Sequence, residues 1–246
     1  MKTKDVAICL RAVNYSETSQ VVTLLTRENG KLAAMAKGSR RPKSAFDGAM
    51  EVFSYGQVMF VASETNDKLA TLTEFVQMPR FRLLRATLPS LHAGLFAIEL
   101  TEAFCQQYDP HPELFDALAD SLEKFQQGGT PQAVLYALID YQRTLLDEVG
   151  IAPLLDRCTN CGLTLKADWP ALYFSSAAGG LLCLGCEQSF TEKRRLSPAC
   201  AVLLNQWQPF EKTTGALLAE AEQILLHHFT ELMHHPPKMA KFFVAR

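Results

Sequence analysis

The chain lacks any long apolar run, and this limits the class of protein it can be. No stretch of its 246 residues approaches the roughly 20 apolar residues that a membrane-spanning helix needs. Residues 1–5 show no apolar core followed by a small-residue cleavage site, so we expect no secretory signal. Seven cysteines, an odd number, without such a signal favour a reducing compartment, and the cytoplasm is the expected location.

Signatures of common catalytic folds are also missing. The sequence has no Gly-x-Gly-x-x-Gly, no Gly-x-x-x-x-Gly-Lys-Ser/Thr phosphate loop and no Gly-x-Ser-x-Gly nucleophile turn. The histidine pairs at 227–228 and 234–235 have no carboxylate-rich pattern beside them, so we expect surface or helix-end histidines rather than a metal site. The chain is therefore predicted not to be an enzyme.

What is present is an ordinary globular composition with an uneven charge. Apolar residues make up 48% and charged residues 20%, and the length suits two or three small domains. Residues 1–80 carry eleven lysines and arginines against eight aspartates and glutamates, whereas the remainder carries thirteen against eighteen. This asymmetry weakly indicates an anionic partner for the N-terminal part.

The first eighty residues predict β-structure. Five runs with alternating or continuous apolar residues cover 6–10, 21–26, 32–36, 52–62 and 68–76. The second and third runs flank Asn29-Gly30, a strong hairpin signal because both residue types tolerate positive φ. Five short strands suit a small OB-type barrel better than a sandwich, which needs about seven strands.

Beyond Pro79 the apolar spacing becomes helical. Apolar residues from Leu84 to Phe104 predict a helix buried on two sides, and Thr130-Pro131 and Ser197-Pro198 predict two further helix starts. We expect an α+β multidomain chain with three parts. They are an OB-fold nucleic-acid-binding domain over 1–80, a helical domain over 81–150 and 190–246, and a zinc-binding module over 151–189.

Two Cys-x-x-Cys pairs, Cys158/Cys161 and Cys183/Cys186, predict that zinc-binding module. Thiolates three residues apart on a tight turn face one ion, and two such pairs complete a tetrahedral S₄ shell. The 21 residues between the pairs leave room for a short β-ribbon. A closed shell has no open position for substrate, so we expect structural Zn²⁺. Redox-active pairs and loss of the metal are the less favoured alternatives.

A cluster of cations is the candidate DNA-binding site. Four cations lie within seven residues after the third predicted strand: Lys37, Arg40, Arg41 and Lys43. Three further cations at neighbouring strand ends extend this cluster: Arg11, Arg27 and Lys31. Charge alone favours a solvated loop, and Lys193-Arg194-Arg195 is a second run for which DNA contact and solvation are equally favoured. Four aromatics are candidate stacking platforms, with core packing preferred: Tyr15, Phe46, Phe53 and Tyr55.

Several motifs together resemble one known family. They are Tyr15-Ser16-Glu17-Thr18, Leu25-Thr26-Arg27-Glu28-Asn29-Gly30, the stretch from Ala36 to Ser44, Leu72-Thr73-Glu74, and the two segments that carry the paired cysteines. Their order along most of the chain is similar to that in the bacterial DNA repair protein RecO family, recombination mediators in which many members carry the same cysteines. This resemblance reverses the preference for a solvated loop in favour of DNA contact.

The resemblance implies an OB barrel, a helical domain and a zinc module without enzymatic activity. Such proteins bind single- and double-stranded DNA, anneal complementary strands, contact the C-terminal tail of the single-stranded DNA-binding protein SSB, and act with RecR to help load RecA. A cytoplasmic, nucleoid-associated location follows. The SSB tail needs a hydrophobic groove with a basic rim, for which spacing does not choose among Arg82, Arg85, Arg143 and Arg157. A zinc-stabilised adaptor that binds RNA or a protein partner is the alternative.

Overall fold

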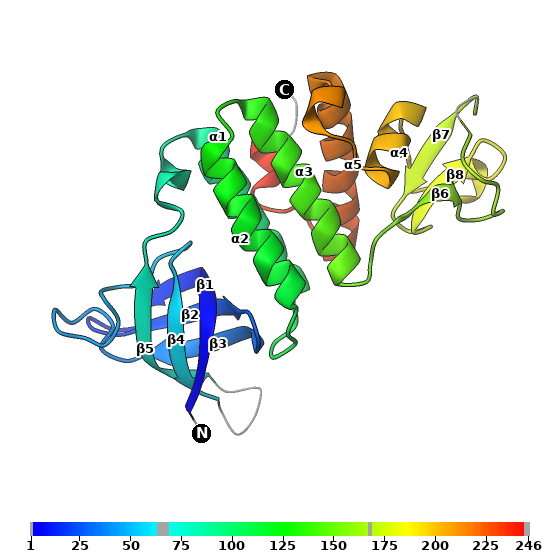
Figure 1. Cartoon of the computed structure of the whole chain (residues 1–246). Coiled ribbons are helices and arrows are strands. Elements are labelled where there is room, and N and C mark those ends of the chain that lie inside the picture. Colours follow the sequence, from blue (N-terminus) through cyan, green and yellow to red (C-terminus); the bar gives the residue numbers. More distant parts are fainter. Residues whose placement is uncertain (1, 63–68, 167–168, 244–246) are drawn as a thin grey trace. The chain divides into compact units, whose positions relative to one another are not determined.

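A computed structural model describes residues 2–62, 69–166 and 169–243 of the chain (Figure 1). The residues group into two compact units. The first unit comprises Met1–Thr87 with Thr101–Gln126, and the second comprises Leu88–Leu100 with Gln127–Arg246. The domain boundaries predicted from the sequence at residues 80, 150 and 189 stay a prediction. No helix among the described residues is long and apolar enough to cross a membrane.

Five strands form the sheet of the first unit: β1 (Lys2–Asn14), β2 (Gln20–Thr26), β3 (Gly30–Ala36), β4 (Tyr55–Val61) and β5 (Ala70–Met78). The sheet closes on itself in the order β1-β2-β3-β5-β4, and β1 pairs with both β2 and β4. Every pairing is antiparallel except that of β3 with β5 (Figure 1). The prediction of a five-stranded N-terminal sheet is confirmed.

Most strand bounds differ from the prediction by a few residues, and the start of the fourth strand differs for a local reason. The fourth strand begins at Tyr55 rather than at residue 52, because Phe53 has a φ of 73° and cannot continue an extended chain. The predicted strand over 52–62 is therefore wrong at its start, and Phe53 is not part of a strand. The start of the fifth run at Lys68 lies outside the described residues, and β5 begins at Ala70.

The core of the sheet follows the period-2 pattern of the sequence. Alternate residues of β2 and β3 point inward, and small alanines at 7, 34, 36 and 70 let the strands close tightly around larger side chains. Phe46 and Met50, from the segment between β3 and β4, complete this core. That segment is therefore held to the end of the sheet by the burial of its own apolar side chains.

The remaining elements of the first unit follow the sheet. Arg82–Arg85 form a 3₁₀ turn, and α2 (Pro112–Gln127) buries its apolar stripe, which includes Leu114, Leu118 and Leu122. Helix α1 (Leu88–Phe104), whose residues up to Leu100 belong to the second unit, begins after this turn, so the predicted single helix from Leu84 is wrong at its start. Pro89 near the start of α1 is tolerated because the first helical N–H groups need no intrahelical partner.

The second unit contains α3 (Pro131–Glu148), α4 (Pro198–Asn205) and α5 (Gly215–Met233). The two predicted helix starts are confirmed. Thr130 caps α3 by accepting a hydrogen bond from the Ala133 N–H at 3.2 Å, and Ser197 caps α4 by accepting from Cys200 at 3.1 Å. These caps satisfy backbone donors that have no partner within their helices.

A four-stranded sheet in the second unit carries the cysteines. Its strands are β6 (Leu154–Cys158), β7 (Leu172–Ser175), β8 (Gly180–Cys183) and β9 (Arg194–Arg195), in the order β6-β8-β7-β9. The antiparallel pair β7 and β8 (Figure 1) follows the first cysteine pair, and β8 ends at Cys183, so a β-ribbon lies where the 21-residue spacing predicts it. Parallel pairing of β6 with β8 brings Cys158 opposite Leu181, two residues before Cys183.

Candidate nucleic-acid interface and metal centre

The segment after β3 is anchored by a buried polar network centred on Gln20. The Gln20 Oε1 accepts hydrogen bonds from the Ser39 hydroxyl and the Met50 N–H, both at 3.0 Å, and its Nε2 donates to the Met50 carbonyl at 3.1 Å. Ser39 and Gln20 are both buried. We call this segment, residues 37–50, the basic loop. The network joins β2 to both ends of the basic loop and thereby holds it in one conformation.

The four cations of the basic loop are exposed on this anchored backbone: Lys37, Arg40, Arg41 and Lys43. None of them forms an ion pair with a carboxylate among the residues that the structure describes. Gly38 turns the chain between them with a φ of 73°, a conformation that glycine adopts without strain. The loop therefore presents a concentration of uncompensated positive charge.

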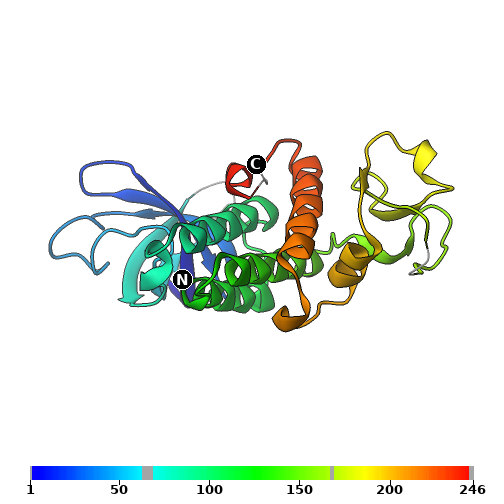
Figure 2. The ribbon, with the colours of Figure 1, turned by 90° about the horizontal axis from the view of Figure 1, so that it is seen from above.

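The turn from β1 to β2 lies beside the basic loop. The Arg40 N–H donates to the Thr18 carbonyl at 3.1 Å, and the Gly38 N–H donates to the Ser19 hydroxyl at 3.2 Å. Figures 1 and 2 show both connections at the same end of the sheet. Between them is an open hollow of about 430 Å³, and it is lined by Tyr15, Ser19, Met35, Lys37, Gly38 and Arg41.

The other three predicted cations contact the protein itself. Arg27 forms a bidentate pair with Asp116 at 3.0 and 2.8 Å, and Arg11 lies 3.9 Å from a Glu102 carboxylate oxygen. The Lys31 ammonium donates to the Glu102 carbonyl, and burial lowers its pKa.

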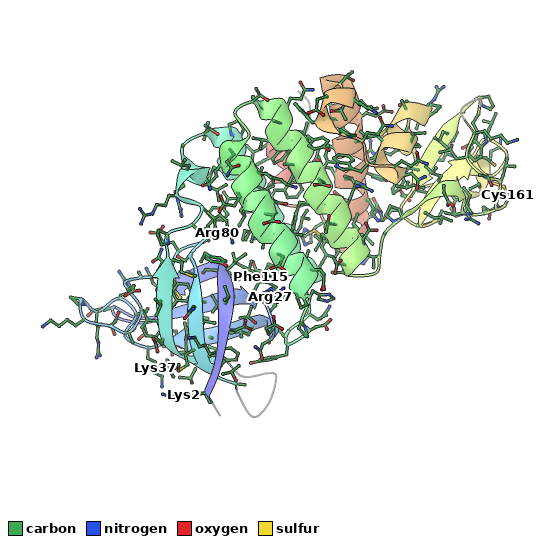
Figure 3. All side chains as sticks on the ribbon, in the orientation of Figure 1. Lys2, Arg27, Lys37, Arg80, Phe115 and Cys161 are labelled. Carbon is green, nitrogen blue, oxygen red and sulfur yellow. The ribbon has the colours of Figure 1, made fainter. Side chains whose placement is uncertain are left out.

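These three cations also lie away from the basic loop along the strands. Arg27 and Lys31 flank the β2–β3 turn, whereas Lys37 follows the far end of β3, and Figure 3 labels Arg27 and Lys37 at well-separated parts of the sheet. Arg11 pairs with Thr23 in the middle of β2. The structure does not bring them into one track with the basic loop, because opposite ends of a hairpin are separated by the length of its strands.

The candidate stacking aromatics divide into two groups. Phe46 and Phe53 are buried, and Tyr55 packs edge-on against Phe81 with ring centroids 5.7 Å apart, so core packing, which the sequence favoured, is confirmed for these three. Tyr15 is the exception, because 70% of it is exposed. It borders the hollow beside Lys37 and Arg41.

The four paired cysteines converge in the second unit. All four Sγ atoms lie within 4.8 Å of one another, and those of Cys161 and Cys183 are 3.8 Å apart. A tetrahedral zinc with Zn–S bonds of about 2.3 Å requires sulfur–sulfur separations of about 3.8 Å. The donor set and its geometry therefore fit a four-coordinate metal ion.

Cys158 is the buried member of this set. Burial raises the pKa of its thiol, but hydrogen bonds from backbone N–H groups, including that of Cys183 at 3.4 Å, outweigh burial and lower the pKa overall. Backbone donors that favour a thiolate also favour metal ligation. Cys161 is exposed, and Cys183 and Cys186 are half-buried, so the site lies near the surface of its module.

His227 and His228 do not lie at the surface or helix-end positions that the sequence predicted. His228 is buried and its Nδ1 lies 2.7 Å from the Ser176 hydroxyl, while the His227 ring contacts the Glu192 carboxylate. His228 joins α5 to the turn between β7 and β8, and His227 joins α5 to the segment that precedes β9. The prediction of surface or helix-end positions is wrong for both, although His234 does end α5, with a φ of 58°.

Of the second basic run, Lys193-Arg194-Arg195, one residue contacts the protein itself. The Lys193 ammonium donates to the Glu187 carbonyl at 2.8 Å, whereas Arg194 and Arg195 are exposed on the edge strand β9.

Sequence reasoning overlooked the Gln20 anchor, although a signal for it was present. Gln20 lies on the same face of β2 as the buried Val22 and Leu24, so the alternating pattern of the strand indicates that its amide points inward.

Comparison with known proteins decides the family. A family model described as the N-terminal part of recombination protein O matches residues 1–78, and the corresponding C-terminal model matches residues 85–239. The chain belongs to the RecO family. The prediction made from its motifs is thus confirmed, and the assignment makes it a member of a DNA repair family.

Curated relatives carry the same name. The chain is 35% identical to the DNA repair protein RecO of Rhodopirellula baltica over 74% of this chain and 66% of the relative. It is 38% identical to that of Salinibacter ruber over 61% and 57%, and 28% identical to that of Bacillus pumilus over 98% and 93%. The chain thus spans less than two thirds of the first two relatives and most of the third.

Proposed function

We propose that this protein is a non-catalytic mediator of recombinational DNA repair, which binds single- and double-stranded DNA through the basic loop and anneals complementary strands. The observation that carries the proposal is the group of four exposed cations on an anchored loop: Lys37, Arg40, Arg41 and Lys43. The closed five-stranded sheet with parallel β3 and β5 supports assignment as an OB-type barrel, a fold whose rim loops engage oligonucleotides.

Annealing needs no side-chain chemistry. Two anionic strands must approach each other while their bases stay free to pair, and lysine and arginine contacts to phosphates permit this without reading sequence. A rigid loop loses less conformational freedom on binding than a flexible one. The proposal therefore needs no catalytic residue, and it places the protein in the cytoplasm with the nucleoid DNA.

The proposed metal is a structural Zn²⁺ bound by Cys158, Cys161, Cys183 and Cys186. A four-thiolate shell supports this choice, because zinc in such sites is four-coordinate and has no vacant position for a substrate. Its contribution is to hold β6, β8 and their turns together.

We propose the SSB tail, RecR and, indirectly, RecA as protein partners. For the SSB tail, support comes from a cavity of about 190 Å³ in the second unit, where apolar side chains that include Ile224 and Phe174 lie beside polar ones, Arg143, Asp147 and Asn205. Arg157 pairs with Asp156 and Arg85 with Glu51, and Arg82 belongs to the first unit. Arg143, whose Nε donates to the Leu204 carbonyl at 2.9 Å, is the candidate cation that lines this cavity. An acidic and hydrophobic peptide matches that combination.

Changing the four loop cations to alanine tests the DNA proposal. Four lost phosphate contacts at about 0.7 each should flatten the plot of log K against log[salt] for single strands by about 3. A matched control exchanges Lys for Arg and Arg for Lys at the same positions, which keeps the charge and should keep the slope. Fluorescence anisotropy with labelled oligonucleotides over a salt series measures both.

An unchanged slope of log K against log[salt] in the alanine variant would refute the proposal. Annealing of complementary oligonucleotides without nucleotide, with and without SSB, is the second measurement. The adaptor alternative predicts no annealing and no preference for single-stranded DNA.

A further inference from the structure

Tyr15 is an exposed aromatic side chain held on a fixed turn. It follows β1, and 70% of it is exposed, although exposure of a large ring is unfavourable in water. The turn is internally bonded: the Tyr15 N–H donates to the Ser19 carbonyl at 3.0 Å, and the Ser16 hydroxyl accepts from Thr18 and Ser19 at 3.4 and 3.2 Å. The ring is therefore carried by an ordered backbone.

The hollow beside Tyr15 has fixed walls. One wall is the β1–β2 turn, the other is the basic loop, and Thr18 and Ser19 accept hydrogen bonds from the loop backbone. The opposite ends of the loop are anchored through Gln20. The volume of about 430 Å³ falls within the range of small-ligand sites. The hollow is thus formed before any ligand arrives.

The chemistry of this lining is that of a nucleotide site. Lys37 and Arg41 supply two cations, Tyr15 a π-face and Met35 a polarisable thioether, and none of the described residues that line the hollow is acidic. Phosphate contacts require the cations, whereas an unpaired base requires a flat apolar face. A single hollow offers both.

We propose that this hollow holds one unpaired nucleotide, with its base stacked on Tyr15 and its phosphates bound by Lys37 and Arg41. The inference rests on the proposed DNA-binding function and adds the element that distinguishes single strands from duplex. A base within a duplex has both faces covered by its neighbours, so it enters the hollow only at the cost of unstacking. Charge then sets affinity for all DNA, and the ring sets preference for single strands.

Replacing the ring separates these two contributions. Tyr15→Ala should weaken binding of an oligothymidylate about 5- to 150-fold, the range for losing one base stack. Its affinity for duplex DNA and for an abasic strand of equal length should stay within about twofold. Tyr15→Phe keeps the π-face and should bind the oligothymidylate as the wild type does. The salt dependence of DNA binding should be the same in the wild type and in both variants, because no cation is removed.

Val13→Ala is the matched control, since Val13 is also exposed near the end of β1 but does not line the hollow. Equal losses on oligothymidylate, abasic strand and duplex in Tyr15→Ala would overturn the inference, and so would the absence of any loss. Neither outcome touches the proposed function, which is tested separately by the salt slope of the alanine variant of the loop cations and by the annealing assay.

Discussion

Glu222 on α5 should make stability depend on pH in a way that one substitution removes. Its side chain is 1% exposed, and its Oε1 accepts a hydrogen bond from Gln142 Nε2 at 3.2 Å. Glu222 Oε2 and Gln142 Oε1 have no hydrogen-bond partner among the described residues. Burial raises the pKa of this carboxyl to about 7, while the Gln142 hydrogen bond lowers it by less. A proton on Oε2 supplies the donor that this pair of oxygens lacks.

The sign and the size of the effect of Glu222 on stability follow from the pKa of its carboxyl in the folded state and its ordinary pKa. The folded value of about 7 exceeds the ordinary value of 4.5, so the folded state holds more protons between these pH values. Stability is therefore fully present below pH 4.5 and falls as pH rises towards 7. At 1.36 kcal/mol per unit of pKa shift, the total loss is about 3 kcal/mol.

His228 has the opposite effect over part of this window. Burial lowers the pKa of its imidazole from 6.5 to about 4, so stability is lost as pH falls from 6.5 towards 4. The two effects largely cancel between pH 4.5 and 6.5 in the wild-type protein. The contribution of Glu222 is visible only as a difference from a variant that lacks its titration.

Urea unfolding of the wild type and Glu222→Gln at pH 5, 6, 7 and 8 measures that difference. The free energy of unfolding of the variant should rise relative to the wild type by about 2–3 kcal/mol from pH 5 to pH 8. Glu231→Gln, an exposed position on the same helix, should show no such trend. A gap between wild type and Glu222→Gln that stays constant over this pH range would refute the reasoning.

Two further predictions concern the metal centre and the first sheet. Changing Cys158 and Cys161 together to Ser should lower the melting temperature and the zinc content without a matching loss of DNA affinity. Unaltered values of both would contradict four-thiolate ligation. Gly30→Ala should destabilise by more than about 2 kcal/mol, because its Cβ would lie 2.2 Å from the Asp109 carbonyl oxygen at a φ of +70°. Gly150→Ala, with a φ of +72° and open space around it, is the matched control, and equal losses in chemical denaturation would disprove the steric argument.

Local patterns predicted much of the architecture. Asn29-Gly30 marks the β2–β3 hairpin, and Thr130 and Ser197 mark two helix starts, because each signal acts within a few residues. Local reading failed where tertiary contacts overrode it. Phe53 looks like a strand residue, yet its ring is buried while its backbone turns at positive φ.

The candidate site shows the same division. The charge density of the basic loop was readable because its cations are adjacent in sequence. The sequence did not show whether Arg27 and Lys31 join these cations. They lie ten and six positions before Lys37, yet they are at the opposite end of the hairpin and bind the protein's own Asp116 and Glu102. His228 could not be placed either, since its burial depends on Ser176, 52 residues earlier.

By itself the sequence determined the family, the five-stranded sheet, the cysteine spacing and the location of the positive charge. These features depend on residue type and on spacing within a few residues. Only the tertiary structure decided which cations remain unpaired, that Tyr15 borders a preformed hollow, and that the two cysteine pairs meet at one point. Such outcomes depend on packing between segments far apart in the chain, whose partners a linear pattern does not specify.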